Sequence, residues 1–432
     1  MRAWEKLSIF LLCATLLCGC SAQKHGQIET EEPKDTSKVH LTMFGFKVGA
    51  EQILSIESVL NDFMKKNPDI SITYEGLSNQ DGYLDVLYNR LESGTADDIF
   101  MLNPNAFAEM DRRGYIGSKI FDLSSTDNIS NYNDTIQQLI HMGDQVPGVP
   151  LAMGSYGIFV NVDKLNEYGL SIPVTLDEFL NCCSTIRSQG EIPIAASLKD
   201  EGYAAKIIAL GRFLAVHDLE DNRTLDYDAY NNGSLSLGED LREGFQLIDT
   251  FCQEGYWDTE KALTIPAWTS EVNDFTDGSH AFLLGASWSL SQIWKGDPSF
   301  HYEFVALPLG TENNLAIIKA SLPICVNAKS AHLKEALQFI DFVSEPEVVD
   351  LFTNLGVALS PLKNGKSSVD DLNNISQTVS QGRASSAADP RLHLDLETTA
   401  GKLCAQIAQG TITVDEAVEN IDRILLGEAD NE

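Results

Sequence analysis

Hydrophobic and polar residues alternate in short blocks through the first third of the chain, beginning near residue 39. Val39–Met43 has the period of two that is typical of a strand. Ala50–Lys66 has apolar residues at helical spacing and stops before Asn67-Pro68. The pattern then repeats, with predicted strands at Ile70–Tyr74 and 98–102 and predicted helices at Tyr83–Leu91 and 106–113. Strands that alternate with helices predict a mainly parallel sheet with helices on its faces.

A Pro-Gly-Val-Pro run at 147–150 predicts a break in this pattern. Beyond it, Thr175 and Glu178 form a capping box that predicts a helix to about Arg187, and a similar pattern precedes a helix at Val414–Leu426. Apolar runs predict strands at Gly157–Val162, His280–Leu284 and Phe304–Leu307, and a helix at Ala331–Val343. The polar, Ser-rich stretch 367–389 is expected to be an exposed loop.

The first twenty residues predict export. Two basic residues precede Leu7–Leu17, an apolar run too short to span a bilayer but long enough for a signal peptide. The run ends in Leu17-Cys18-Gly19-Cys20, which resembles the bacterial lipobox, although Cys18 stands where Ala or Ser is commoner. This resemblance implies a signal peptide at 1–19, a lipid on Cys20 and attachment to the outer face of the cell membrane. The alternative is an ordinary signal peptide with a chance cysteine. Residues 20–37 are polar and predict a flexible tether.

Charge and length narrow the class of protein. The chain has 432 residues, which suggests two domains after the signal peptide is removed. It carries 63 acidic against 30 basic residues, a formal net charge of −33. Because phosphate binding depends on clustered Lys and Arg, nucleic acid is an unsuitable partner. The charge also disfavours attraction to anionic lipid, so a lipid anchor accounts better for membrane attachment.

The cysteines point to no cofactor. Three of the eight belong to the signal peptide and lipobox, and the remaining five have no C-x-x-C spacing: Cys182, Cys183, Cys252, Cys325 and Cys404. Neither a zinc site nor a disulfide framework is supported, because both need cysteines in regular groups. We expect these cysteines to be small residues of the hydrophobic core, and we expect the protein to use no metal or cofactor.

Four stretches, in this order, carry a resemblance to a known family. Residues 61–70 are similar to its "F…NPDI.V" opening, and 91–99 to its "L.SG..PDI" segment, with Asp97 in place of Pro. Residues 149–179 follow its central block, and 278–288 are similar to "GKAAM…G.W". The chain from Val39 thus resembles the bacterial extracellular solute-binding proteins of the maltose-binding type, which serve ABC importers of sugars.

This resemblance implies an α/β fold of two discontinuous lobes joined by a hinge, the type II periplasmic-binding-protein-like fold. By analogy, one lobe comprises residues 38–148 and 309–355, and the other 149–308 and 356–432. The ligand, expected to be a carbohydrate and more specifically an oligosaccharide, is held between the lobes. Ligand closes the hinge, and the closed monomer docks on the permease.

A sugar site needs aromatic rings for the apolar faces of the sugar and polar groups for its hydroxyls. Trp288 occupies the family's stacking position, the alternative being a tryptophan buried in the core. Trp268 lies in a polar stretch and is a further candidate. Tyr203 falls where the family often has a contact aromatic, and Ser155 and Tyr156 are candidates because they are expected in the loop on the hinge side.

The loops after the first three predicted strands supply the remaining candidates, because ligands of open α/β sheets meet the carboxyl ends of strands. These candidates are Phe46, Lys47, Asn79, Asp81, Asn103 and Asn105. Asp81 and Asn105 have an alternative reading as helix N-caps.

Two rival functions remain open at this point. A secreted glycosidase would need a pair of catalytic carboxylates, but no recognisable catalytic motif is present, so we expect no enzyme. A transport protein for an amine, a phosphate ester or a peptide is the other alternative. Lys47 is the one cation among the candidate residues of the strand-end loops, which disfavours a highly charged anion.

Overall fold

The computed structural model describes residues 38–48, 50–78, 81–220, 225–365, 367–387, 389 and 391–429. It does not describe the side chains of residues 50–52 and 105. The predicted signal peptide, Cys20, the tether and Asn79 lie outside the described residues. None of the described helices is both long and apolar enough to span a bilayer.

One mixed sheet runs through the described residues, with the strand order β2-β1-β3-β8-β4-β6-β5, and with β7 beside β4 and β9 beside β8. Its strands are β1 (Val39–Gly45), β2 (Ile70–Gly76), β3 (Ile99–Met101), β4 (Val149–Asn161), β5 (Ile194–Ala195), β6 (Phe282–Ala286), β7 (Tyr302–Val305), β8 (Ala316–Val326) and β9 (Ala384–Ser385).

The helices of the first half are α1 (Ala50–Lys66), α2 (Tyr83–Ser93), α3 (Phe107–Arg112), α4 (Asp134–Ile140), α5 (Val162–Glu167), α6 (Leu176–Ser188) and α7 (Tyr203–Ala215). Those of the second half are α8 (Tyr227–Asn231), α9 (Leu237–Glu254), α10 (Thr259–Ala262), α11 (Ser270–Thr276), α12 (Leu290–Gly296), α13 (Leu333–Val343), α14 (Pro346–Leu355), α15 (Asn373–Ser380), α16 (Leu396–Ala408) and α17 (Val414–Leu425). Short 3-10 helices include η2 (Pro104–Ala106), η3 (Asp127–Asn131), η5 (Ser287–Ser289) and η6 (Asp370–Leu372), and a π-helical turn, η4 (Val216–Glu220), follows α7.

Strands β1, β2 and β3 are parallel, as their alternation with helices predicts. Successive side chains of a strand point to opposite faces. Leu41 and Met43 of β1 accordingly join a core with α1, α13 and α14, whereas Phe44 joins a separate core with α2 and α3. Both faces of this part of the sheet are therefore covered.

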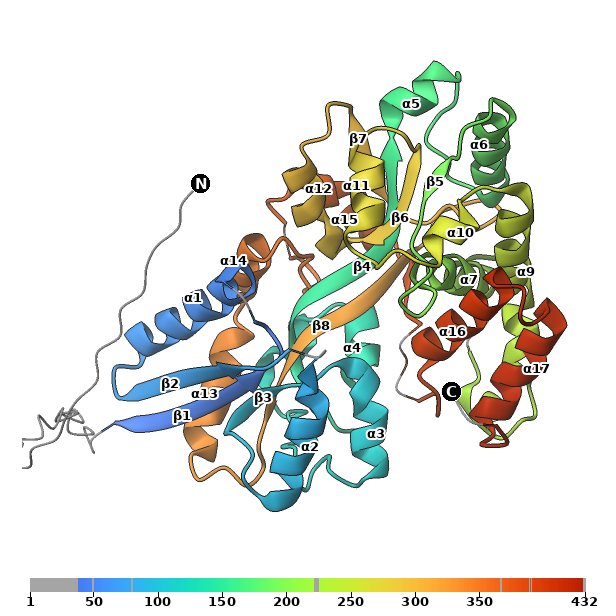
Figure 1. The fold of residues 1–432 in the computed structure, drawn as a ribbon. Helices are drawn as coiled ribbons and strands as arrows, with labels where there is room; N and C mark the ends of the chain where they lie inside the picture. The colour runs from blue at the N-terminus through green and yellow to red at the C-terminus, as the bar shows by residue number, and fades with distance from the viewer. Residues whose placement is uncertain are drawn as a thin grey trace, which may run out of the picture. The chain divides into compact units, whose positions relative to one another are not determined.

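The long strands β4 and β8 connect this part of the sheet to the rest. They pair antiparallel from Val149 opposite Ile324 to Tyr156 opposite Ile317, and Figure 1 shows them side by side between β1–β3 and β5–β7. The break expected at 147–150 is wrong in part, because Val149 and Pro150 already belong to β4. Beyond Tyr156, β4 pairs with β6 and β7 instead of β8.

A second large core fills the part of the molecule beyond β4, between the sheet and α6, α7, α9, α16 and α17. The capping boxes predicted before α6 and α17 are both present, at Thr175 with Glu178 and at Thr413 with Glu416. All five described cysteines are free thiols; Cys183, Cys325 and Cys404 have almost no exposed surface, and burial raises the pKa of each thiol.

The stretch 367–389 is not the exposed loop that its composition predicts. It contains η6, α15 and β9, and Leu372 and Ile375 are fully buried. Leu372, Ile375 and Val379 stand at helical spacing and anchor an otherwise polar segment, which a reading of average polarity overlooks.

Candidate ligand-binding cleft

A cleft of about 1210 Å³ lies at the carboxyl ends of β1 and β3 and beside the middle of β8. Loops from the part of the molecule beyond β4 form its other side. Its first wall consists of Phe46, Lys47, Leu84, Tyr88, Asn103, Pro104, Ala106, Ala108, Glu109 and Arg112. Its floor is Lys319, Ala320, Ser321 and Leu322 of β8. Its second wall consists of Glu201, Trp268, Trp288, Ser289, Ser291, Gln292, Asp389, Leu392, Leu394 and Asp395.

The first wall is built at the carboxyl ends of parallel strands, where open α/β sheets bind ligands. Phe46 and Lys47 follow β1, and Asn103 follows β3. Tyr74 of β2 fixes the first of these loops: its hydroxyl accepts from the Lys47 amide at 3.1 Å and donates to the Lys47 carbonyl at 2.9 Å. Burial raises the pKa of Tyr74 to about 12, so the hydroxyl stays a donor at neutral pH.

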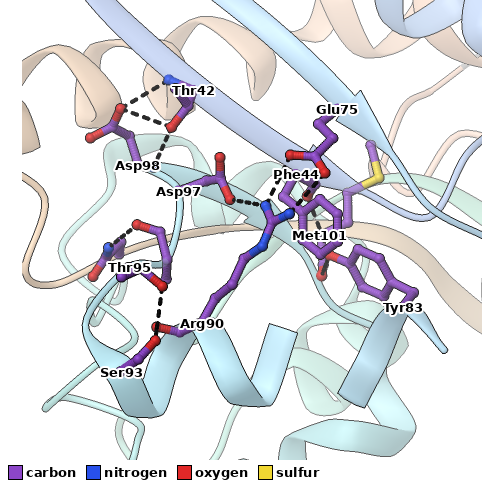
Figure 2. A network of polar contacts seen from close by, with 12 residues as sticks. Thr42, Phe44, Glu75, Tyr83, Arg90, Ser93, Thr95, Asp97, Asp98 and Met101 are labelled. Atoms are coloured by element: carbon purple, nitrogen blue, oxygen red, sulfur yellow. Dashed lines mark hydrogen bonds and ion pairs between the residues drawn. The ribbon is translucent and has the colours of Figure 1, made fainter. Parts of the chain in front are cut away.

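Arg90 of α2 ties together the strands behind this wall (Figure 2). Its guanidinium forms ion pairs with Glu75 at 2.8 Å and Asp97 at 2.7 Å, and it lies 4.0 Å from the ring centroid of Phe44. Asp97 is the residue that departs from the family's usual proline. Here that departure gives Arg90 a second carboxylate, which ties α2 to the segment just before β3.

Trp288 projects into the cleft from η5, directly after β6. It is 39% exposed, and its inner edge contacts the buried ring of Tyr156 with centroids 5.4 Å apart. Gly154 of β4 lies under the indole: a Cβ built there would be 2.8 Å from Cζ3 of Trp288. The absence of a side chain at Gly154 lets the indole approach the backbone of β4, and the exposed part of the ring is accessible from the cleft.

Trp268 is held in a strained backbone conformation. Its φ is +67°, and its amide donates to the buried carboxylate of Glu271. Its ring contacts the buried Tyr203 edge-on at 5.3 Å, and Tyr203 lies 6.3 Å from Tyr156. Trp268 is also 39% exposed. Two buried tyrosines thus back two half-exposed tryptophans on the same wall.

The floor carries a charge pair. Lys319 donates to Glu397 of α16 at 2.5 Å, and the Tyr156 hydroxyl donates to the same oxygen at 3.3 Å. Glu397 is only 4% exposed. Burial, and then the charge of Glu397, raise the pKa of Tyr156, so its hydroxyl remains protonated. Lys319 therefore lines the cleft with its charge already compensated from behind.

The sequence profile of the bacterial extracellular solute-binding protein family matches residues 58–364, more than half of the chain. The chain belongs to this family. A multiple sugar-binding protein of Streptococcus mutans is 23% identical over 370 residues, which are 84% of either chain.

Solved structures of solute-binding proteins share the fold. RafE of Streptococcus pneumoniae in its apo-form has a TM-score of 0.74 at 20% identity, over 91% of this chain and 98% of that chain. RafE in complex with raffinose has a TM-score of 0.71 at 20% identity, over 91% and 100% of the chains. A Bacillus licheniformis sugar transporter protein in complex with stachyose reaches 0.68 at 19% identity, over 90% and 100%. The two-lobed α/β fold expected from the sequence is confirmed.

Of the predicted site residues of this solute-binding protein, the structure places five on the cleft: Phe46, Lys47, Asn103, Trp268 and Trp288. Lys47 makes no ion pair with the described residues, and burial lowers its pKa.

Tyr156 and Tyr203 lie behind the tryptophans instead of on the cleft surface. Ser155 is fully buried, and its hydroxyl donates to the Tyr156 carbonyl.

The remaining predictions have other outcomes. Asp81 is outside the cleft lining, and its carboxylate accepts from the Ser78 hydroxyl. Its alternative reading as a helix N-cap is wrong, because Gly82 is the N-cap of α2. Asn105 lies in η2, but its side chain is outside what the structure describes, as is Asn79.

The sequence reasoning missed several cleft residues, chiefly Tyr88, Arg112, Glu201, Lys319 and Asp395. Tyr88 of α2 packs partly against the core beneath α2 and α3 and also lines the cleft. The position of Glu201, with Gly202 just before a long apolar helix, is the sequence feature that could have pointed to it. The interior of β8 contains no comparable feature that would have pointed to Lys319. Among the described residues no group of three or more His, Cys, Asp or Glu could hold a metal ion.

Proposed function

We propose that this protein is the extracellular substrate-binding component of an ABC importer and that it captures a carbohydrate in this cleft. The observation that carries the proposal is the pair Trp268 and Trp288, each 39% exposed on one wall. Half-exposed indoles with buried supports offer flat apolar faces, which suit the CH faces of sugar rings. Two such faces favour an oligosaccharide over a monosaccharide.

The polar groups around the tryptophans suit hydroxyls. Lys47, Asn103 and Gln292 supply donors, and Glu201 and Asp395 supply acceptors. A hydroxyl both donates and accepts, so a mixed set of this kind can satisfy a polyol. The names of the similar proteins point the same way, since they include a multiple sugar-binding protein and complexes with raffinose and stachyose.

The proposal extends to the protein's place in the cell. Export by the signal peptide, lipid on Cys20 and the polar tether would hold a monomer at the outer face of the membrane, within reach of a permease. Closure of the two predicted lobes, residues 38–148 with 309–355 and residues 149–308 with 356–432, would enclose the sugar before delivery. No step alters the ligand, so the protein returns it unchanged.

A panel of thermal melts tests the proposal, with raffinose, stachyose, maltotriose, xylotriose, polyamines and sugar phosphates as ligands. A ligand at 100 times its Kd stabilises the native state by about 2.7 kcal/mol, which raises the Tm by degrees. We expect saturable stabilisation by a related group of sugars, and its loss in Trp288→Ala.

Trp294→Ala is the matched control, because Trp294 is 43% exposed but lies outside the cleft lining. It should retain the response to sugar. Stabilisation by polyamines or sugar phosphates alone would be compatible with a transport role, but it would refute the proposal that the ligand is a sugar. Conversion of any sugar, detected by chromatography, would refute the binding role and indicate an enzyme.

A further inference from the structure

Strained backbone is concentrated at the cleft. Five described residues other than glycine have a positive φ, and three of them line the cleft: Glu201 at +50°, Trp268 at +67° and Leu322 at +55°. Residues with a Cβ atom rarely adopt a positive φ, because this backbone conformation lowers the stability of the folded protein. The packing around each residue must therefore enforce it.

For Glu201 and Trp268 the enforcing contacts are linked. Asp200, the neighbour of Glu201, accepts a hydrogen bond at 2.7 Å from the amide of Ala267, the neighbour of Trp268. On the other side, the Glu201 carbonyl packs against Gly401 of α16 so closely that a Cβ on Gly401 would be 2.1 Å from it. One hydrogen bond thus fixes the two left-handed residues relative to each other.

The carboxylate of Glu201 retains acceptor capacity towards the cleft. Oε2 of Glu201 and Oδ2 of Asp395 lie 3.4 Å and 3.0 Å from the same Thr398 hydroxyl, which has one proton to donate. Lys206 forms an ion pair with Oε2 of Glu201 at 3.6 Å, and the Glu201 side chain is 51% exposed. Oε1 accepts no hydrogen bond from the residues that the structure describes.

We propose that Glu201 is a ligand-contacting residue that, together with Trp268, forms a subsite for a neutral, hydroxyl-rich sugar ring and rejects a ring that carries a carboxylate. The inference rests on the proposed sugar-binding function. Stacking on Trp268 brings the edge of a ring to Glu201, whose oxygens accept from hydroxyls. Asp395 beside it adds a second negative charge. Lys206, which pairs with Glu201, balances only one of these two carboxylates, and Lys319 is already paired with Glu397.

Two substitutions of Glu201 separate its contact with ligand from its effect on the fold. Glu201→Gly relieves the left-handed strain, but it also takes the ion-pair partner from the buried Lys206, so the two effects oppose each other and we expect a Tm within a few degrees of the wild type. Its Kd for the best-binding neutral trisaccharide among raffinose, maltotriose and xylotriose should rise roughly ten- to hundredfold, because a charged hydrogen bond is lost. Glu201→Gln keeps the shape and the strain and should weaken the same Kd by about tenfold.

Asp297→Gly is the matched control. Asp297 has a φ of +44° at the end of α12 and does not line the cleft, so its replacement relieves similar strain without touching the ligand. We expect an unchanged Kd. Trigalacturonate should bind the wild-type protein at least tenfold more weakly than the neutral trisaccharide, and this ratio should narrow in Glu201→Gln.

Calorimetric titration of the purified protein decides between the outcomes. An unchanged Kd in both Glu201 variants, or preferred binding of trigalacturonate by the wild type, overturns the role of Glu201 while the sugar-binding function stands. Failure of the wild type to bind any of these sugars overturns the function itself, and this inference with it. Loss of binding in Asp297→Gly as well would show that the loss comes from a change in the fold. It would contradict the proposal that Glu201 contacts the ligand.

Discussion

The two walls of the cleft are built in different ways. The first wall presents Phe46, Lys47 and Asn103 at the ends of parallel strands, where the regular fold exposes loop residues. The second wall presents Trp268 and Glu201 on left-handed backbone, which the fold does not provide by default. The positions of the side chains on this wall depend on buried groups such as Glu271 and the tyrosines behind the indoles. The second wall is therefore preorganised for its ligand, at some cost in stability.

The two lysines of the cleft show the same difference. Lys319 of the floor is paired with the buried Glu397, which also accepts from Tyr156 of the second core. Lys47 of the first wall makes no ion pair with the described residues, and burial lowers its pKa. One lysine is part of the scaffold, whereas the other is available to a ligand.

The largest expected effect is on stability. Lys319→Met leaves the carboxylate of Glu397 buried without its ion-pair partner, which should cost about 3 kcal/mol of unfolding free energy. Urea denaturation of the single variant measures the loss.

The double variant Lys319→Met with Glu397→Leu is the control, since it removes the stranded charge and should recover most of the stability. A loss below about 1 kcal/mol in the single variant would show that the pair is not part of the scaffold.

The next effect is on binding through the second wall. Gly154→Ala places a Cβ where Trp288 now lies and should displace the indole, which weakens sugar binding roughly tenfold or more with little change in stability. In a Trp288→Ala background the same substitution should have no further effect, because nothing is left to displace. Equal losses of affinity in both backgrounds would contradict this account of Gly154.

The sequence predicts the first wall better than the second for a physical reason. Periodicity and capping locate α1, β2, α6 and α17 within a few residues, and the loops after parallel strands follow from that pattern. Trp288 was predicted through the family resemblance and Trp268 from the polar stretch around it, and neither was predicted through periodicity. Glu201 and Lys319 depend on long-range contacts with α16. Glu201 contacts Thr398, 197 residues along the chain, and Lys319 contacts Glu397, 78 residues along the chain; no local pattern encodes either contact.

A smaller effect is expected at the support of the first wall. Tyr74→Phe removes both hydrogen bonds that hold the Lys47 backbone and should cost about 1 kcal/mol of stability, with a several-fold weaker Kd for sugar. Chemical denaturation and titration measure the two quantities. If the Kd rises as much as in Gly154→Ala, the first wall is as tightly preorganised as the second, and the comparison fails.

The smallest effect is expected at Lys47. Because burial lowers its pKa, the unfolded chain binds the proton more tightly than the native protein, and stability rises with pH between the lowered pKa and 10.5. Lys47→Met abolishes this dependence and should stabilise the protein slightly at pH 7, by up to about 0.5 kcal/mol. Denaturation curves at pH 7 and pH 10 test it. A loss like that of Lys319→Met would reveal an ion pair that this structure lacks among the described residues.

The central claim is that the second wall is the sugar-binding platform, and calorimetric titration tests it most directly. Wild type, Trp288→Ala, Trp268→Ala and Trp294→Ala are titrated with raffinose, stachyose, maltotriose and xylotriose. We predict saturable binding of at least one sugar by the wild type and by Trp294→Ala, and a loss of at least tenfold in both cleft variants. Binding that is unchanged in Trp288→Ala and Trp268→Ala, or absent from the wild type, would contradict the claim.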